Sequence, residues 1–528
     1  MPRTFRNPIL PGFYPDPSIC RVGDDYYLVT SSFEYFPGLP IFHSRDLVHW
    51  HQIGHVLDRP SQLNLDGIAP SRGLWAPTIR HHRGVFYVVN TFMDNANRPA
   101  NFVVTAADPA GPWSEPYWLE GAEGIDPSLF FDDDGRAWYC GNRVPPAGEA
   151  FPGHREIWLQ GFDPQTMRLI GDKVTLWDGA LKGAFHPEGP HIYKVHGQYY
   201  LLIAEGGTGF NHSITIARSP AITGPYRGHS LNPILTHRHL GQDYPITGIG
   251  HADLVETQRG EWWLVTLAMR PYGGYAYNLG RETFLAPVQW QHIETEVDEG
   301  WWPVIAPGEG HVALEGSAPD LPEHRWPSQP ACDHFEAAAL AACWCTLRTP
   351  RETWYSLAER PGFLRLHLRP QTLSELANPS FIGRRQQHVD FAVRAALEFA
   401  PAGENECAGL VLLQNKSFHF RFVVTAAGQR RVIRLVQRKA GEETLLAEQP
   451  IAANRIYLKI EAHGQAYAFY VASTAEAWQP VAEGVDGTLL GAPAARTFTG
   501  TMIGMYASSN GLSSDNVADF DWFEYTGT

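Results

Sequence analysis

Long apolar runs and helical periodicity are both scarce in this sequence. No stretch of 18 apolar residues could form a membrane-spanning helix, and the opening MPRTFRNPILPGFYPDPS lacks the apolar segment of a secretory signal peptide. We therefore expect a cytoplasmic protein that does not associate with membranes. Few windows place apolar residues at helical spacing, which argues against a mainly helical fold.

Cysteine and positive charge are also in short supply. The six cysteines are scattered, and Cys343 and Cys345 have the wrong spacing for a zinc knuckle, so reduced thiols are expected. The 41 Lys and Arg against 56 Asp and Glu give a formal net charge of −15, which disfavours nucleic acid as a partner. A neutral ligand fits better, and the 17 Trp and 21 Tyr offer aromatic faces on which sugar rings can stack, although most of them will be core.

The residues that are abundant favour strands and turns. Short runs of Val, Ile, Tyr, Phe and Trp recur between Gly, Pro, Asp and Asn, and the 50 Gly and 41 Pro show no collagen-like period. We therefore predict an all-β protein. Its 528 residues exceed what one hydrophobic core usually organises, so two domains are expected.

A repeat runs through the first three hundred positions. Each unit opens with a polar or aromatic residue, continues as a short apolar strand, reaches a turn glycine and enters an aromatic strand. The openings are DPSI from Asp16, WAPTI from Trp75, DPSLFF from Asp126, EGPHIY from Glu188 and HADLVE from His251, and they lie 59, 51, 62 and 63 residues apart. Such a hairpin with room for two further strands makes one propeller blade, so the repeat predicts a five-bladed β-propeller.

The five openings should surround one axis, because the innermost strand of each blade faces the central channel. Taken singly, each residue has a simpler explanation. An Asp before Pro is common in turns, a Glu before Gly-Pro can be solvated, and a lone His or Trp is usually structural. Their recurrence in register favours a functional site, since three carboxylates are seldom buried without partners.

A different pattern follows a Pro-rich segment. We predict a propeller domain over residues 1–306, a linker over 307–330 and a β-sandwich domain over 331–528, where alternating strands such as FLRLHLRP and FHFRFVV lack the polar openings. The segment EAAALAACW, residues 336–344, is the one helix-like exception.

Several of these motifs occur together in one known family. DPSI, WAPTI, DPSLF and EGPHIY, with NPILPGFYPDPS at the start, GHADLVE and LGRETFL later and ADFDWFEY at the end, resemble glycoside hydrolase family 43. The similarity is greatest to the β-xylosidase branch with a C-terminal β-sandwich, and it covers essentially the whole chain. It implies a five-bladed β-propeller and an inverting, exo-acting β-xylosidase that releases xylose from the non-reducing end of short xylo-oligosaccharides.

The resemblance also implies roles for individual residues. Asp16 matches the general base that activates water, Glu188 the general acid, and Asp126 the carboxylate that orients the acid and tunes its pKa. Substrate contacts are implied for five further residues: Arg281 in GRET, the pocket aromatics Phe33 and Trp75, the channel histidine His251, and Phe498, which the sandwich domain would insert at the pocket rim.

Breaking a glycosidic bond requires this combination of groups. One protonated carboxyl serves the leaving oxygen and one carboxylate acts behind the anomeric carbon, and inverting enzymes hold the two roughly 6.5–9.5 Å apart so that a water fits between them. We expect the like charge of Asp126 to raise the pKa of Glu188, and Arg281 to oppose that effect.

Other functions stay open at this level. The same pocket can accept arabinofuranose, so an α-L-arabinofuranosidase or a dual enzyme is the nearest alternative. A non-catalytic carbohydrate-binding propeller would need the aromatics but no acid–base pair. A fructoside hydrolase is disfavoured, because its WMNDPNG-type opening, RDP and Glu-Cys motifs are absent.

We expect no required cofactor or metal. The FDDDG run at residues 131–135 lacks the ligand spacing of an EF-hand and suits a solvated turn. A calcium ion in the propeller channel near His251 is left open, since the matching histidine touches one in some relatives. Relatives with this sandwich domain often assemble, so a homodimer or homotetramer is expected.

Overall fold

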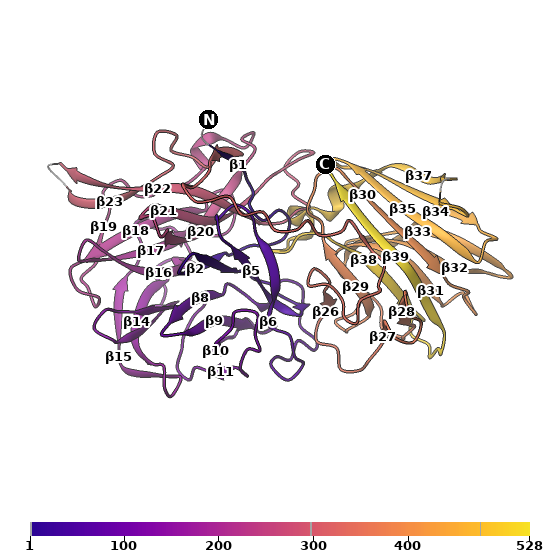
Figure 1. The fold of residues 1–528 in the computed structure, drawn as a ribbon, viewed down its shortest axis with the longest axis horizontal. Helices are drawn as coiled ribbons and strands as arrows, with labels where there is room; N and C mark the ends of the chain where they lie inside the picture. Colours follow the sequence, from indigo (N-terminus) through magenta and orange to yellow (C-terminus); the bar gives the residue numbers. More distant parts are fainter. Residues whose placement is uncertain (1–2, 296–297, 476) are drawn as a thin grey trace.

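The computed structural model describes residues 3–295, 298–475 and 477–528, and the chain is almost entirely β-structure in two parts (Figure 1). The all-β prediction is confirmed. Within the described residues, no helix is long and apolar enough to cross a membrane.

The first part contains five antiparallel sheets in chain order. Listed from the innermost strand outward, they are β2 (Ser18–Val22), β3 (Asp25–Val29), β5 (Gly38–Ser44) and β6 (His51–Leu57); β8 (Thr78–His82), β9 (Val85–Met93), β10 (Pro99–Ala106) and β11 (Tyr117–Trp118), with β7 (Gly73–Leu74) beside β9; β12 (Ser128–Phe131), β13 (Ala137–Arg143), β14 (Glu156–Asp163) and β15 (Arg168–Trp177); β16 (Glu188–Val195), β17 (Gln198–Glu205), β18 (Ser213–Ser219) and β19 (Arg227–Gly228); and β20 (Thr247–Glu256), β21 (Trp262–Met269), β22 (Glu282–Glu294) and β23 (Glu299–Ile305).

The innermost strands close into a ring. β2 contacts β8, β8 contacts β12, β12 contacts β16, β16 contacts β20, and β20 returns to β2. Each inner hairpin turns at a glycine in the left-handed region, with φ between 63° and 85° at Gly23, Gly84, Gly135, Gly197 and Gly260. A side chain is strained at such a φ, which explains why glycine recurs at this point of every repeat. The sheets and their closure form the propeller that the repeat predicts.

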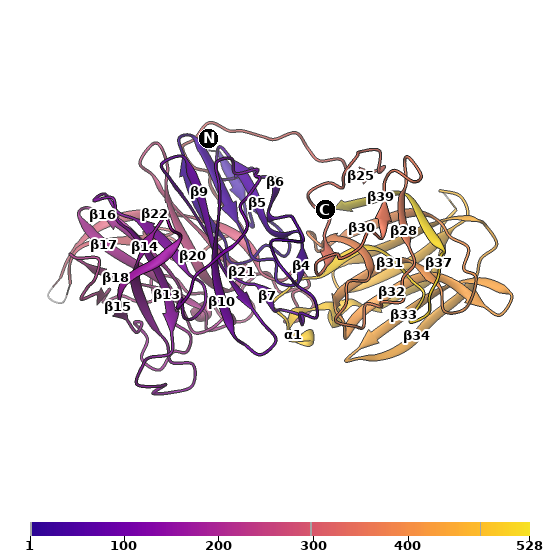
Figure 2. The same cartoon turned by 90° about the horizontal axis from the view of Figure 1, so that it is seen from below.

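The connection between the two parts is anchored on the propeller. β24 (Glu315–Ser317) pairs with β1 (Thr4–Arg6), and the ring of Trp326 stacks on His51. Figure 2 shows this connection crossing from the propeller to the second part along one edge of the molecule.

The second part is a sandwich of two antiparallel sheets around one core. One sheet has the order β27 (Tyr355–Ser356), β28 (Leu364–His367), β39 (Val517–Gly527), β30 (Phe391–Glu398), β35 (Arg455–His463), β36 (Ala466–Ala472) and β37 (Gln479–Asp486), with β25 (Cys332–Asp333) beside β39. The other has β29 (Ser380–Arg385), β38 (Met502–Ser508), β31 (Cys407–Asn415), β32 (Phe418–Ala427), β33 (Arg430–Lys439) and β34 (Glu442–Pro450). Buried residues of both sheets, such as Val393 and Leu410, share one hydrophobic cluster.

Helical structure is short and lies elsewhere than predicted. The segment 336–344 forms bends and a turn, so the helix expected there was wrong. Its run of alanines supplies helix propensity but no apolar stripe long enough to dock, and an isolated helix of that length is marginal. The helical elements of the described residues are η1 (Arg238–Leu240), η2 (Gly487–Leu490) and α1 (Ala492–Ala495).

The sandwich is joined to the first blade by strand pairing and by a shared core. β4 (Tyr35–Phe36) pairs with β26 (Thr346–Leu347), and the buried Arg385 donates from Nε to the carbonyl of Phe13 at 2.6 Å. Phe13 and Phe33 of the propeller pack in one cluster with Phe381 and Tyr506 of the sandwich. Phe498 packs against this shared cluster, and its amide donates to Ser71 of the propeller.

Candidate active site

A cavity of about 450 Å³ opens at the end of the channel where the inner strands begin. All eight site residues predicted from the sequence line it: Asp16, Phe33, Trp75, Asp126, Glu188, His251, Arg281 and Phe498. The five repeat openings therefore do meet around one axis. Pockets of about 300–1,000 Å³ with a few convergent polar groups are typical of small-molecule sites.

The backbone at three of the openings is held in the left-handed region. Asp16, Asp126 and His251 have φ of 55°, 53° and 47°, and in the fourth repeat Gly189, directly after Glu188, has φ 59°. Asp and His tolerate this region better than most residues, and each such position costs of order 1–3 kcal/mol. Strain repeated in register at the pocket, and maintained by the surrounding blades, marks it as a functional site.

Asp16 is the carboxylate with a cationic partner. Arg281 donates from Nη1 to Oδ1 of Asp16 at 2.8 Å, and Ser31 donates from Oγ to Oδ2 at 2.6 Å. Asp16 and Arg281 are 5% and 6% exposed, so their ion pair is largely shielded from water. This leaves Asp16 anchored at the pocket floor.

Among the described residues no cation pairs directly with Glu188 or Asp126, and both pKa values are raised. Burial is the largest cause of the rise in the pKa of Glu188 to about 8, the charge of Asp16 adds to it, and Arg281 opposes it. Burial, followed by the charges of Glu188 and Asp16, raises the pKa of Asp126 well above its ordinary value. Glu188 can thus hold a proton at neutral pH.

The predicted cause is only part of this rise. We expected the like charge of Asp126 to raise the pKa of Glu188; the two carboxyls do repel each other, but desolvation of Glu188 is the largest cause of the rise, and the charge of Asp16 adds to it. Desolvation could not be judged from the sequence, because it arises from blades and loops that are remote along the chain. The opposing effect of Arg281 is confirmed.

Aromatic side chains and Arg281 form one wall of the pocket. The ring of Phe498 lies 6.1 Å from that of Trp75 and 6.2 Å from that of Phe33, and the Arg281 guanidinium lies 5.3 Å from the Phe498 ring centre. Ser71 links these groups. Its Oγ accepts from the Phe498 amide at 2.9 Å, and its carbonyl accepts from Trp75 Nε1 at 3.1 Å.

Other lining residues were missed by sequence reasoning. Phe185 and His186 precede Glu188, and residues 206–212 follow β17; both segments line the cavity. A Cβ on Gly207 would lie 2.5 Å from the Phe185 ring, so only glycine lets the two segments approach. The GGTGF run, residues 206–210, was the available signal, but it does not match the pattern of the repeat.

His251 is buried and lines the pocket, and the carboxylate that follows it on the same strand is already paired. Burial lowers the pKa of His251, which favours the neutral imidazole. The carboxylate two residues later, Asp253, already accepts from several donors and is paired with Arg80. Within the described ranges no group of three or more His, Cys, Asp or Glu side chains is arranged to hold a metal.

Comparison with known proteins gives matches over both parts of the chain. Residues 5–295 match the family described as Glycosyl hydrolases family 43, and residues 332–526 match the Beta xylosidase C-terminal Concanavalin A-like domain. A relative from Butyrivibrio fibrisolvens named "Xylosidase/arabinosidase" is 47% identical over 98% of both chains. A "Non-reducing end alpha-L-arabinofuranosidase" from Bacteroides ovatus is 41% identical over 99% of this chain and 95% of its own.

A solved structure resembles the whole fold. The crystal structure of a xylan beta-1,4-xylosidase from Bacillus halodurans C-125 superposes with a TM-score of 0.92 at 40% sequence identity. The match covers 99% of this chain and 100% of that one, so propeller and sandwich occur there in the same arrangement.

Proposed function

The chain belongs to glycosyl hydrolases family 43, and from this membership and the pocket we propose that it is an inverting, exo-acting β-xylosidase. Its substrates would be short xylo-oligosaccharides, from which it releases xylose at the non-reducing end. The observation that carries the proposal is the pairing of a protonatable Glu188, whose pKa is about 8, with an anchored carboxylate, Asp16, in one cavity.

The roles follow from the environments of the three carboxyl groups. Glu188 protonates the leaving oxygen, and Asp16 takes a proton from the water that attacks the anomeric carbon from the other side. Asp126, buried beside Glu188, orients that acid and supports its protonated form. Because the raised pKa of Glu188 lies near neutrality, the acid is both populated and able to release its proton.

The pocket walls supply the substrate contacts. Arg281 has donors that can reach sugar hydroxyls, and Phe33, Trp75 and Phe498 offer ring faces for the C–H groups of a pyranose. Phe498 at the rim supports exo action, since a capped cavity accepts a chain end more readily than an internal segment.

An α-L-arabinofuranosidase activity, alone or beside the xylosidase, is the second candidate. The names of the Bacteroides ovatus and Butyrivibrio fibrisolvens relatives favour it, at 41% and 47% identity. A purely carbohydrate-binding role is disfavoured by the two raised carboxyl pKa values. The cytoplasmic location and the dimeric or tetrameric assembly stay predictions.

A panel of aryl glycosides tests the proposal. Purified protein should release 4-nitrophenol from the β-D-xylopyranoside, and relative rates on the α-L-arabinofuranoside separate the two candidates. Xylotriose should first give xylose and xylobiose. A rapid fall in the viscosity of xylan before xylose appears would contradict exo action, and inactivity on every glycoside would leave only a binding role.

A further inference from the structure

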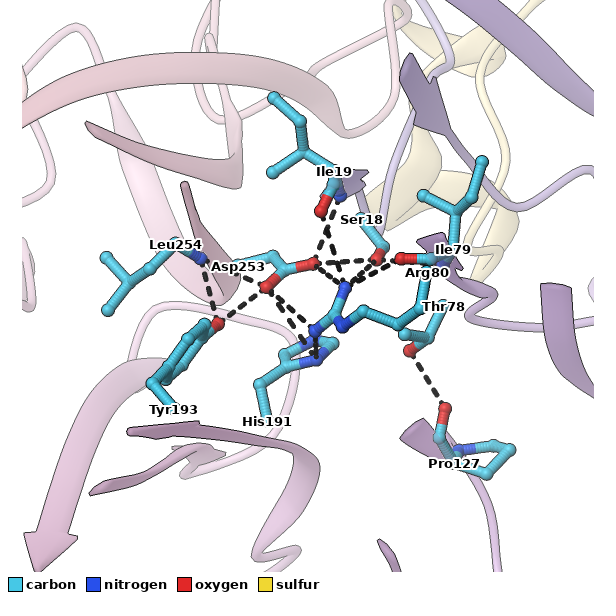
Figure 3. A network of polar contacts seen from close by, with 10 residues as sticks. All are labelled: Ser18, Ile19, Thr78, Ile79, Arg80, Pro127, His191, Tyr193, Asp253 and Leu254. Carbon is cyan, nitrogen blue, oxygen red and sulfur yellow. Dashed lines mark hydrogen bonds and ion pairs between the residues drawn. The ribbon is translucent and has the colours of Figure 1, made fainter. Parts of the chain in front are cut away.

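One layer below the pocket, the largely shielded guanidinium of Arg80 lies where the inner strands converge (Figure 3). Asp253 on β20 receives hydrogen bonds from three other inner strands as well as its own: from Ser18 Oγ at 2.7 Å and Ile19 N at 3.0 Å on β2, Arg80 Nη1 at 2.8 Å and Nη2 at 3.1 Å on β8, Tyr193 OH at 2.5 Å on β16, and Leu254 N at 3.0 Å. Both oxygens are fully used.

The charges in this layer are balanced. The side chain of Asp253 is 0% exposed and that of Arg80 is 17% exposed. Burial by itself would raise the pKa of Asp253, but the charge of Arg80 and the hydrogen bonds from Arg80 and Tyr193 outweigh it and hold that pKa well below its ordinary value. Burial also lowers the pKa of His191 to about 3, so this imidazole is neutral and its Nδ1 accepts from Arg80 Nη2 at 2.8 Å.

The layer is tied to the strands that carry the site. Ser18 lies two residues after Asp16, His191 three residues after Glu188, and Asp253 two residues after His251. The remaining inner strand, β12, is linked by a different hydrogen bond. Thr78 Oγ1 of β8 donates at 2.8 Å to the carbonyl of Pro127, which directly follows Asp126 (Figure 3). A shift of Arg80 would therefore be transmitted to the base, the acid and the third carboxylate.

We propose that Arg80 and Asp253 are positioning residues, and that the Arg80 guanidinium is the built-in cation of the propeller channel. It holds the inner strands at the separation that the carboxylates above them require. The proposal builds on the function proposed for those carboxylates. Because six donors already surround Asp253, the channel needs no calcium ion there, and the protein should not respond to one.

The Arg80→Met variant tests this role, since it keeps an unbranched apolar stem and removes the charge and the hydrogen bonds. We expect kcat on an aryl β-xyloside to fall about 10²-fold, the size expected when reacting groups are misplaced by about 1 Å, while KM changes little. Arg365→Met is the matched control, because Arg365 forms a two-bond pair with Asp519 in the sandwich. This control should keep the wild-type kcat.

A double variant and a small-molecule rescue separate positioning from folding. Arg80→Met combined with Asp253→Leu removes both charges, so it should fold even where the single variant does not, yet keep the low kcat. In Arg80→Ala, added methylguanidinium should restore part of the activity, and it should do nothing for Arg365→Ala. Wild-type kcat in the double variant would overturn the proposal, as would a failure of methylguanidinium to act on folded Arg80→Ala.

Thermal unfolding of the wild type supplies a readout that does not depend on activity. Its Tm should be the same in excess EDTA and in excess calcium chloride. A calcium-dependent rise in Tm would overturn the assignment of the channel cation to Arg80. Inactivity of the wild type on all glycosides would instead contradict the proposed function, and is thus distinguishable.

Discussion

Two neighbouring layers of the propeller channel use the same strands for opposite purposes. In the pocket layer, Asp126 is buried and Glu188 is half-buried, neither has a cationic partner among the described residues, and both pKa values are raised. In the layer below, Asp253 is surrounded by donors, and its pKa is lowered. The pocket layer keeps carboxyl groups with raised pKa values at a cost in folding stability. The layer below holds the strands rigidly in the positions that this chemistry requires.

The backbone shows the same contrast. Asp16 and Asp126 precede β2 and β12, and His251 lies at a register shift within β20, all three with positive φ, whereas Ser18 already lies in regular β2. In these three blades the strained residue at the pocket therefore lies outside the regular part of the inner strand. If the two layers differ in this way, substitutions in them should differ in the sign of their effect on stability and in the kind of activity they change.

The largest effect is expected for the acid. Glu188→Gln should lower kcat on xylobiose about 10²–10⁴-fold, because the leaving oxygen then lacks its proton donor. An aryl xyloside with a good leaving group should suffer less, since it needs less protonation. Steady-state kinetics on both substrates checks this, and near wild-type activity of the variant on xylobiose would remove Glu188 from the acid role.

Substitutions in the layer around Asp253 should lower the free energy of unfolding. Asp253→Asn leaves the Arg80 guanidinium buried without its counter-charge, which should cost about 3–5 kcal/mol of unfolding free energy. Urea unfolding measures it. Glu315→Gln is the control, because its pair with Arg6 is exposed and should contribute about 0–1 kcal/mol. Equal losses of unfolding free energy in Asp253→Asn and Glu315→Gln would show that the pair of Arg80 and Asp253 contributes no more to stability than an exposed ion pair.

In the pocket layer, the effect of a substitution on stability should depend on pH. Because the pKa of Glu188 is raised from 4.5 to about 8, the folded chain binds more protons than the unfolded chain between these values, and this contribution to stability is lost as pH rises. Glu188→Gln avoids that loss. Its Tm should rise relative to that of the wild type by a few degrees between pH 5 and pH 8, about 1–2 °C for each kcal/mol in a chain of this size.

Scanning fluorimetry at the two pH values gives this difference directly. Asp253→Asn should show no such gain, since the pKa of Asp253 is shifted in the other direction. A pH-independent gap between wild type and Glu188→Gln would mean that this carboxyl is not held protonated by burial.

The smallest effect is expected at the rim. Phe498→Ala removes the ring beside Arg281 and Trp75 but keeps the backbone bond from Phe498 to Ser71. We expect kcat/KM to fall about 10-fold, equivalent to about 1.4 kcal/mol, mainly through a higher KM. Leu512→Ala, an exposed site in the same domain, is the control. A fall in kcat alone would place Phe498 in the chemistry instead of in binding.

Sequence reasoning reached the architecture and the openings of the inner strands, because turn glycines and polar residues recur in register there. It missed Phe185 and the loop at residues 206–212, which occur once and follow no period. It also missed Arg80, whose role depends on closing the ring so that Asp253, 173 residues later, becomes its neighbour. The wall formed by Phe498 was predicted only through the family resemblance.

The stereochemistry of hydrolysis tests the central assignment most directly. If Asp16 activates a water and Glu188 donates the proton, a β-xyloside must release α-xylose first. Proton NMR of the reaction before mutarotation should show the α-anomer rising ahead of the β-anomer. Initial release of β-xylose, or a sugar trapped covalently on Asp16, would contradict the assignment of Asp16 as a base.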